Sequence, residues 1–170
     1  MPGARTVPIA MAICAACALT LTAGDPVPRA PLPPLVAEAV RGIFPRGPVV
    51  AVAYDNTEGG REYEAHLRVD GRDAYVVATD DGVVRETGQA VDEQAAPAEV
   101  REALRLAVPE GPAVTECFRR EFHRGPDGGP LETPCVFYEF TLGAGRDEVF
   151  LAINADGSLR LPEARDEDVE

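Results

Sequence analysis

Apolar residues recur at helical spacing in two stretches of the chain, and prolines bound both stretches. The apolar positions are Val36, Ala39, Val40 and Ile43 in the first stretch and Val100, Leu104, Ala107 and Val108 in the second. Pro33, Pro34 and Pro97 suit the first turn of a helix. Pro45 and Pro109 cannot donate the hydrogen bond that would continue one. The pattern therefore predicts two helices, which begin near residues 33 and 97.

Alternating apolar and polar residues predict strands after each helix. The first set covers residues 49–55, 61–69, 72–79 and 83–87, with turns at Asp70-Gly71 and Asp81-Gly82. The second set covers residues 113–123, 134–142, 147–154 and 158–161, with a Gly- and Pro-rich loop at 124–132. Short connections join antiparallel neighbours, so we expect antiparallel meanders.

The sequence also matches itself at two offsets. The first offset aligns identical residues in and around the helices, from Pro33 with Pro97 to Val50 with Val114. The second aligns identical residues in the strand regions, including Tyr63 with Tyr138. The second offset is the longer one, which predicts a longer hairpin in the second copy. The expected fold is α+β, with tandem units at residues 33–96 and 97–162, each one helix packed on an antiparallel three- to four-stranded meander sheet.

The segment 1–24 has the pattern of a secretory signal peptide. Arg5 is its only charged residue, the stretch from Val7 to Leu21 is apolar, and small residues precede Asp25. An uncleaved anchor or a lipid anchor on Cys14 or Cys17 is the alternative. A Pro-rich linker (25–32) would follow, and residues 163–170 form an acidic tail. We expect a secreted or periplasmic protein, with no stable membrane insertion after cleavage.

The chain carries a net charge of −13, and removing a leader that holds one arginine and no acid would leave −14. Such a charge repels phosphate backbones and anionic lipid, so we expect no nucleic acid partner.

The strand alternation assigns side chains to faces. Tyr138, Phe140 and Leu142 are expected to face inward, and Phe137 and Glu139 outward. The first offset places Phe118 where Tyr54 stands, facing inward. By alternation, Cys117 and Arg119 then face outward with Glu121.

Two cysteines, Cys117 and Cys135, follow the leader, and this number in an exported chain favours one disulfide. A hairpin centred at Pro126 would place the two residues opposite each other on the outward face, at a Cβ separation of about 4 Å that suits the bond. We therefore predict a Cys117–Cys135 disulfide, with two free thiols as the alternative.

The strand and turn sequences resemble PepSY-like domains. The resemblance lies in Glu62–Leu67, Ala74–Ala78 and Asp80–Val84, and again in Phe137–Phe140 and Asn154–Leu159. It implies tandem exported modules with the fold of the beta-lactamase-inhibitor-like proteins, whose open sheet face is presented to a partner. The family has no catalytic motif, and the resemblance names no target.

The candidate chemistry is sparse after the leader. Only His66, His123 and Ser158 supply imidazole or serine hydroxyl groups, and no Ser-His-Asp set can be assembled from them. Asp-Gly turns explain the carboxylates near Asn154 better than a calcium loop does, because Arg165 stands where an EF-hand requires glutamate. No nucleotide-binding glycine loop is present. We therefore expect no enzyme activity, no metal and no cofactor.

The function favoured by these observations is a non-enzymatic binding or inhibitor-like module. Its expected partner is an exported or envelope protein, and the expected contact surface is Phe137, Arg119, Phe122, His123 and Glu139, beside the 124–132 loop. A structural envelope domain without a discrete ligand site is the alternative. The oligomeric state is left open.

Overall fold

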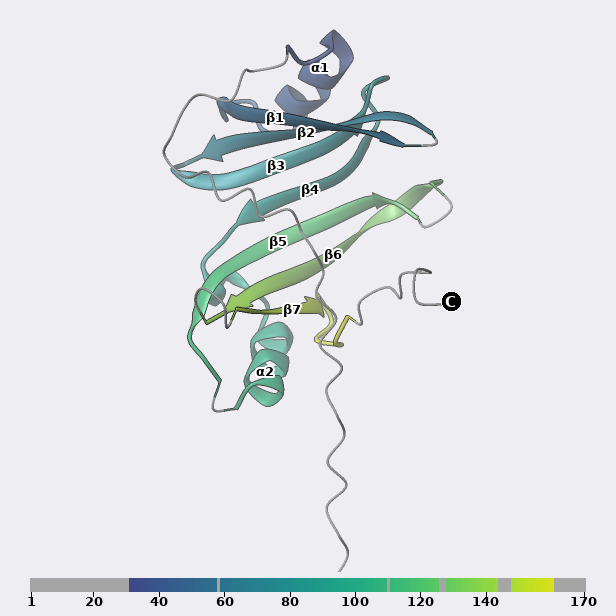
Figure 1. The fold of residues 1–170 in the computed structure, drawn as a ribbon. Helices are drawn as coiled ribbons and strands as arrows, with labels where there is room; N and C mark the ends of the chain where they lie inside the picture. The colour runs from purple at the N-terminus through teal and green to yellow at the C-terminus, as the bar shows by residue number, and fades with distance from the viewer. Residues whose placement is uncertain (1–30, 58, 110, 126–127, 144–147, 161–170) are drawn as a thin grey trace, which may run out of the picture.

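A computed structural model of the chain describes residues 31–57, 59–109, 111–125, 128–143 and 148–160. The predicted leader, most of the predicted linker and the predicted acidic tail lie outside the described residues. Within the described part, the chain forms two α-helices, a short 3-10 helix and seven strands (Figure 1).

The strands form one sheet in the order β1-β2-β3-β4-β5-β6-β7, with every neighbouring pair antiparallel. Helix α1 precedes β1, whereas the 3-10 helix and α2 lie in the connection between β4 and β5. The elements are α1 (Pro34–Ile43), β1 (Val49–Thr57), β2 (Gly60–Val69), β3 (Arg72–Thr79), β4 (Val84–Ala90), η1 (Glu93–Ala95), α2 (Ala98–Ala107), β5 (Val114–Arg124), β6 (Pro130–Leu142) and β7 (Val149–Asn154).

The expectation of two tandem units, each a helix on its own sheet, is wrong. Strand β4 runs on to Ala90 and pairs with β5, from Glu86 opposite Phe122 to Ala90 opposite Phe118, so that all seven strands belong to one sheet. The hairpin turns revealed only pairs of strands joined by a few residues. The β4–β5 pair is joined through α2, and nothing local in the sequence marks it. The strand expected at 158–161 is reduced to a single bridge between Ile153 and Leu159.

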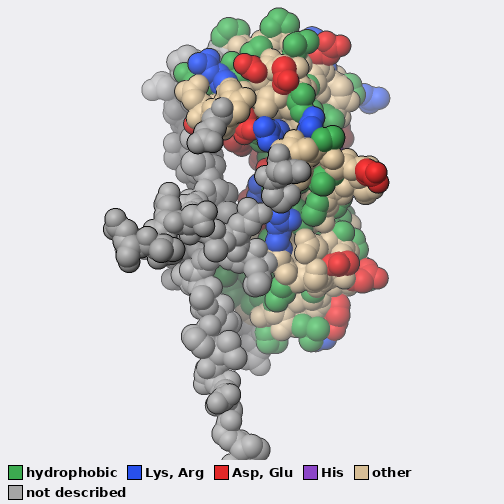
Figure 2. Space-filling model, turned by 90° about the vertical axis from the view of Figure 1, so that its right-hand side faces the viewer, with side chains coloured by type: hydrophobic (Ala, Val, Ile, Leu, Met, Phe, Trp, Pro, Cys, Tyr) green, Lys and Arg blue, Asp and Glu red, His purple; other side chains and the backbone are tan. Residues whose placement is uncertain are grey.

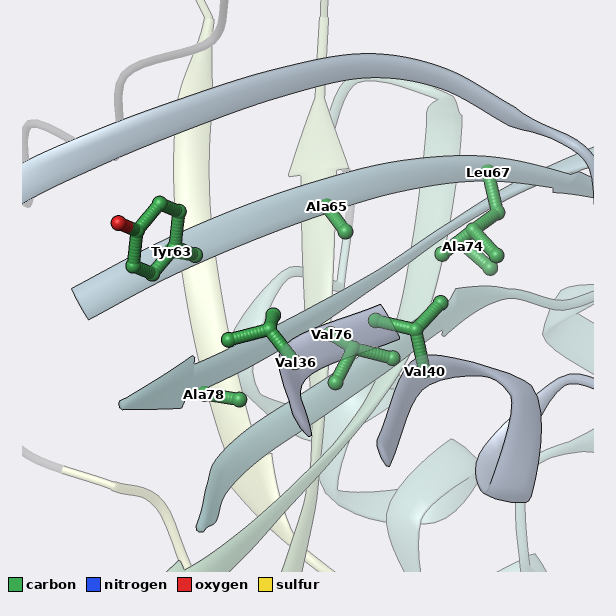
Figure 3. Close-up of a cluster of buried hydrophobic side chains, with 8 residues drawn as sticks. All are labelled: Val36, Val40, Tyr63, Ala65, Leu67, Ala74, Val76 and Ala78. Atoms are coloured by element: carbon green, nitrogen blue, oxygen red, sulfur yellow. The ribbon is translucent and has the colours of Figure 1, made fainter. Parts of the chain in front are cut away.

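Both helices pack on the same face of the sheet, which we call the helix face. Val36 and Val40 of α1 are buried against side chains of β2 and β3, among them Leu67 and Val76 (Figure 3). Val100 and Leu104 of α2 are buried against β5, β6 and β7. The apolar partners there are Cys117, Tyr138, Phe140, Leu142 and Ile153. Each helix therefore contacts the sheet through residues one turn apart, as the apolar spacing predicted.

The Asp-Gly turns hold the helices against the sheet ends. Gly82 and Gly157 have positive φ angles of 82° and 86°, which side-chain-bearing residues rarely adopt. A Cβ atom at either position would lie 2.9 Å from a helix carbonyl oxygen, that of Leu35 beside Gly82 and that of Glu99 beside Gly157. In the second turn, Asp156 accepts hydrogen bonds from both the backbone and the side chain of Ser158. These contacts confirm the prediction that the motif serves as a tight turn.

Replacing Phe140 by alanine is expected to lower the free energy of unfolding by about 3–5 kcal/mol, because this fully buried ring leaves a cavity under α2. Urea unfolding followed by circular dichroism measures the change. Leu106→Ala is the matched control on α2. Its side chain is 65% exposed, so a change within about 0.5 kcal/mol is expected. Equal losses in the two variants would contradict the placement of this core.

Candidate functional site

The face opposite the helices is covered by no helix in the described part of the chain, and we call it the open face. Successive residues of a strand point to opposite faces, and cross-strand partners share a face. Because Ala74 and Tyr138 lie in the core, Tyr75 and Phe137 lie on the open face. One row of partners crosses it from Tyr75 through Gly88 and Arg120 to Phe137 and Asn154.

The centre of the open face is an arginine held between two glutamates. Arg120 donates from Nε to Glu86 at 2.8 Å and from Nη1 to Glu139 at 2.6 Å, and its Nη2 also contacts Glu86. The guanidinium carbon lies 5.7 Å from the ring centre of Tyr75 and 5.3 Å from that of Phe137. We call these five residues the Arg120 cluster. It brings β3, β4, β5 and β6 together through side chains.

A glycine makes room for this arrangement. A Cβ atom at Gly88 would lie 2.2 Å from Cε1 of Tyr75, so the tyrosine ring lies directly over the glycine backbone. From that position the Tyr75 hydroxyl donates a hydrogen bond to the same Glu86 oxygen that Arg120 contacts. Glycine in the middle of a strand often marks such a close approach.

Burial and charge fix the protonation states within the Arg120 cluster. Burial, followed by the negative charge of Glu86, raises the pKa of the Tyr75 hydroxyl above its ordinary value. The hydroxyl therefore keeps its proton and remains a donor at neutral pH. For Arg120, burial lowers the pKa, but the nearby Glu86, Tyr75 and Glu139 outweigh it and raise the pKa overall. Arg120 is thus a permanent cation.

More aromatic and arginine side chains extend the cluster toward β7. Phe122 lies beside Phe137, with ring centres 5.2 Å apart, and Arg160 lies over both rings at 5.0 Å and 4.5 Å. Phe137 is only 3% exposed, although no described helix covers it. Phe118 lies on the other side, 6.2 Å from Tyr75. Figure 2, which views the molecule from the right of Figure 1, shows several arginine side chains along the middle, with acidic side chains above them and along the right side.

The five predicted contact residues are divided between the two faces. Phe137, Phe122 and Glu139 lie together on the open face, as part of or beside the Arg120 cluster. Arg119 and His123 lie on the helix face, because they alternate with Arg120 and Phe122 along β5. Two important members, Arg120 and Glu86, were absent from the predicted surface.

The cause of this error is a β-bulge at the start of β5. Val114 pairs with Leu142, but Glu116 pairs with Thr141, so one extra residue lies between them. The extra residue reverses the alternation for the rest of the strand. Phe118, which was expected inward, therefore faces outward, and Cys117 is buried on the helix face.

The predicted disulfide between Cys117 and Cys135, which lie on β5 and β6, is also wrong. Both cysteines are free, and Cys117 pairs with Phe140 while Cys135 pairs with Phe122. Strand β5 ends at Arg124 and β6 begins at Pro130, and a register irregularity between Phe122 and Arg124 shifts the pairing away from the predicted symmetry about Pro126. The cysteines consequently lie on opposite faces. Cys135 is exposed, and its sulfur lies 3.7 Å from Nη1 of Arg160.

The residues considered for catalysis do not meet at one place. Ser158 belongs to the turn after β7, His66 lies on the open face at β2, and His123 lies on the helix face at β5. Nε2 of His66 is buried and lies 3.1 Å from Glu64, though not in hydrogen-bonding geometry. Within the described ranges, no group of three metal-ligating side chains could hold an ion.

Several solved structures share this architecture. A BLIP-like protein from Bacteroides fragilis superimposes with a TM-score of 0.57 and 18% identity, covering 79% of this chain and 86% of its own. A DUF2874 family protein from Bacteroides ovatus gives 0.55 and 17%, covering 80% and 86%. A protein from Bacteroides eggerthii described as "putative periplasmic" gives 0.57 and 17%, covering 76% and 86%.

The chain has a BLIP-like fold. No family model matches the sequence, and no curated protein does either. At 17–18% identity the likeness establishes the fold alone. It confirms the beta-lactamase-inhibitor-like architecture that the sequence resemblance implied. Among the described residues, no helix has the length and apolar character needed to cross a membrane.

Gly88→Ala is expected to lower the free energy of unfolding by about 1–3 kcal/mol, because the added methyl group must displace the Tyr75 ring. Thermal and urea unfolding measure the loss. Gly42→Ala in α1 is the matched control. No atom lies within 4 Å of the added methyl group there, so stability is expected to stay the same or rise by up to about 1 kcal/mol. If the clash is the cause, adding Tyr75→Ala should recover part of the loss; a fully additive double variant would contradict it.

Thiol labelling is expected to distinguish the two cysteines. Cys135 is exposed and should react with a maleimide in the native protein. Cys117 should resist, because burial, followed by the charges of Glu93 and Glu116, raises its pKa to about 12. Peptide mass spectrometry locates the label before and after unfolding. In the folded Cys135→Ser variant, neither residue 117 nor residue 135 should be labelled. If both cysteines stayed unlabelled in urea until a reductant was added, they would be joined by a disulfide, and the assignment of two free thiols would be wrong.

Proposed function

We propose that this protein is a non-enzymatic binding module that presents its open face to an exported or envelope protein. The observation that supports this proposal most directly is the Arg120 cluster, in which one arginine, two glutamates and two aromatic side chains contact one another on a sheet face that no described helix covers. Aromatic residues and arginine are the side chains that most often dominate the energy of protein interfaces.

The cluster has the features of a preformed contact surface. Its charged groups are already paired: Arg120 binds two glutamates, and Glu86 also accepts the Tyr75 hydroxyl. Binding therefore requires little ordering of long side chains, and an entropic cost that weakens many interfaces is reduced. The aromatic side chains of Phe118 and Phe122 remain partly exposed at its borders and supply apolar area.

The resemblance to PepSY-like domains supports the same reading, including a tandem origin for the repeated sequence matches. The secretory pattern of residues 1–24 supports a secreted or periplasmic location. We propose no enzyme activity, because the serine and the two histidines considered for catalysis, Ser158, His66 and His123, lie on separate parts of the fold.

A capture experiment tests the proposal. The tagged protein is incubated with the exported-protein fraction of its host, and bound proteins are quantified by mass spectrometry. Wild type is compared with Phe122→Ala on the open face and Leu106→Ala on α2, which both remove one large apolar side chain. We expect a specific protein to be retained by wild type and Leu106→Ala, and its recovery to fall roughly tenfold with Phe122→Ala.

Equal loss with both variants, or retention of the captured protein by Phe122→Ala, would contradict an open-face interface. Capture of no specific protein by wild type would favour the alternative, a structural envelope domain without a discrete ligand site. Circular dichroism of each variant must match wild type, so that a loss of capture reports the interface rather than unfolding.

A further inference from the structure

A second feature lies on the other face of the same two strands. The helix face is apolar under α1 and under α2, but between them β4 and β5 carry polar side chains: Thr87, Gln89, Arg119, Glu121 and His123. These residues line a hollow of about 300 Å³, and the end of α1 forms its wall. The hollow is thus built from three elements and is independent of the open face.

The polar groups of the hollow form a short network. Arg119 and Glu121 are in contact as an ion pair, and Glu121 lies 4.0 Å from Nε2 of His123. The same nitrogen lies 3.5 Å from the hydroxyl of Thr87, which is only 7% exposed. The side chains of Arg119 and Glu121 are 41% and 22% exposed, so a solute can reach both charges.

The wall of the hollow is apolar. Gly42, Ile43 and Phe44 end α1 and its cap, and Ile43 is 39% exposed, so a solute in the hollow can contact its apolar side chain. The C-terminal end of a helix also carries partial negative charge, which favours an ammonium group nearby. The hollow therefore combines one cation, one carboxylate, hydrogen-bonding groups and an apolar surface.

We propose that this hollow binds a small zwitterion with an apolar side chain. Such a ligand is a free amino acid, or a very short peptide whose terminal ammonium and carboxylate groups carry the same two charges. Arg119 would bind the carboxylate, Glu121 the ammonium group, and Ile43 with Phe44 the apolar side chain. The hollow has the size of the smallest ligand sites. Partly exposed ion pairs are weak, so parting Arg119 from Glu121 costs little.

Charge balance selects this ligand class over simpler ions. A ligand with only a carboxylate would bind Arg119 but be repelled by the negative charge of Glu121. A ligand with only an ammonium group would bind Glu121 but be repelled by the positive charge of Arg119. A larger hollow, of about 380 Å³, lies at one end of the sheet. Its lining holds two arginines, Arg68 and Arg72, against four acidic residues, so it has an acidic excess and no comparable charge match. The acidic residues are Asp73, Asp92, Glu93 and Glu116.

Nuclear magnetic resonance titration of the purified, isotope-labelled protein tests the proposal with three matched probes. L-leucine carries both charges, 4-methylpentanoate lacks the ammonium group, and 3-methylbutylamine lacks the carboxylate. We expect L-leucine to shift the amide signals of the hollow with a dissociation constant on the order of 1 mM. Each of the other two probes should bind roughly tenfold more weakly or worse.

Two variants and a control locate the effect. Arg119→Gln and Glu121→Gln should each weaken L-leucine binding roughly tenfold, whereas Arg105→Gln, which removes an exposed arginine paired with Glu102 on α2, should leave it unchanged. Absence of saturable shifts with wild type up to about 20 mM L-leucine would overturn the proposal. So would binding of either half-probe as tightly as L-leucine, or shifts confined to the open face. Because the probe series uses wild type, the test stands even if a variant fails to fold.

Discussion

The pairing of β4 with β5 is the interaction on which the rest of this structure depends. It is formed by the ladder from Glu86 and Phe122 to Ala90 and Phe118, and it turns two groups of strands into one seven-stranded sheet. Without it, each group would expose an unpaired inner edge, which is a site for aggregation. The same pairing places Gly88 beside Arg120 and so creates the centre of the open face. On the opposite face it leaves a strip that neither helix covers, and polar side chains occupy that strip.

Arginine chemistry explains why the open face holds its shape. All sixteen basic residues of the chain are arginines. A guanidinium group can bind carboxylates through several N–H groups while its plane lies against aromatic rings, and an ammonium group cannot do both. Arg120 hydrogen-bonds two glutamates, Glu86 and Glu139, while its guanidinium group also lies near the rings of Tyr75 and Phe137. Buried ion pairs contribute little net stability, since desolvation offsets the attraction. We therefore interpret the cluster as a device that fixes side-chain positions on the open face.

Local signals in the sequence were sufficient for both α-helices and for seven of the eight expected strands, but not for their assembly. Prolines placed both helices, and the Asp70-Gly71 turn set the pairing of β2 with β3, which continues without a break from Val69 and Arg72 to Glu62 and Thr79. The β4–β5 pair could not be predicted, because α2 separates the strands and no turn residue records their register. The bulge after Val114 was equally hidden. A single extra residue exchanges the two faces of β5, so Arg119 was chosen for the open face where Arg120 lies.

The molecule as a whole is strongly acidic, whereas the Arg120 cluster at the centre of the open face is nearly neutral. The net charge of −13 acts over distances comparable to the Debye length, so it attracts basic partners and repels acidic ones before contact. In the proposed interface, the paired charges of the Arg120 cluster would offer no free anion, and recognition would depend on the fit of aromatic surfaces. Under this proposal, different residues would govern the rate of association and the lifetime of the complex. The centre tolerates little change, because Gly88, Tyr75 and Glu86 hold one another in place.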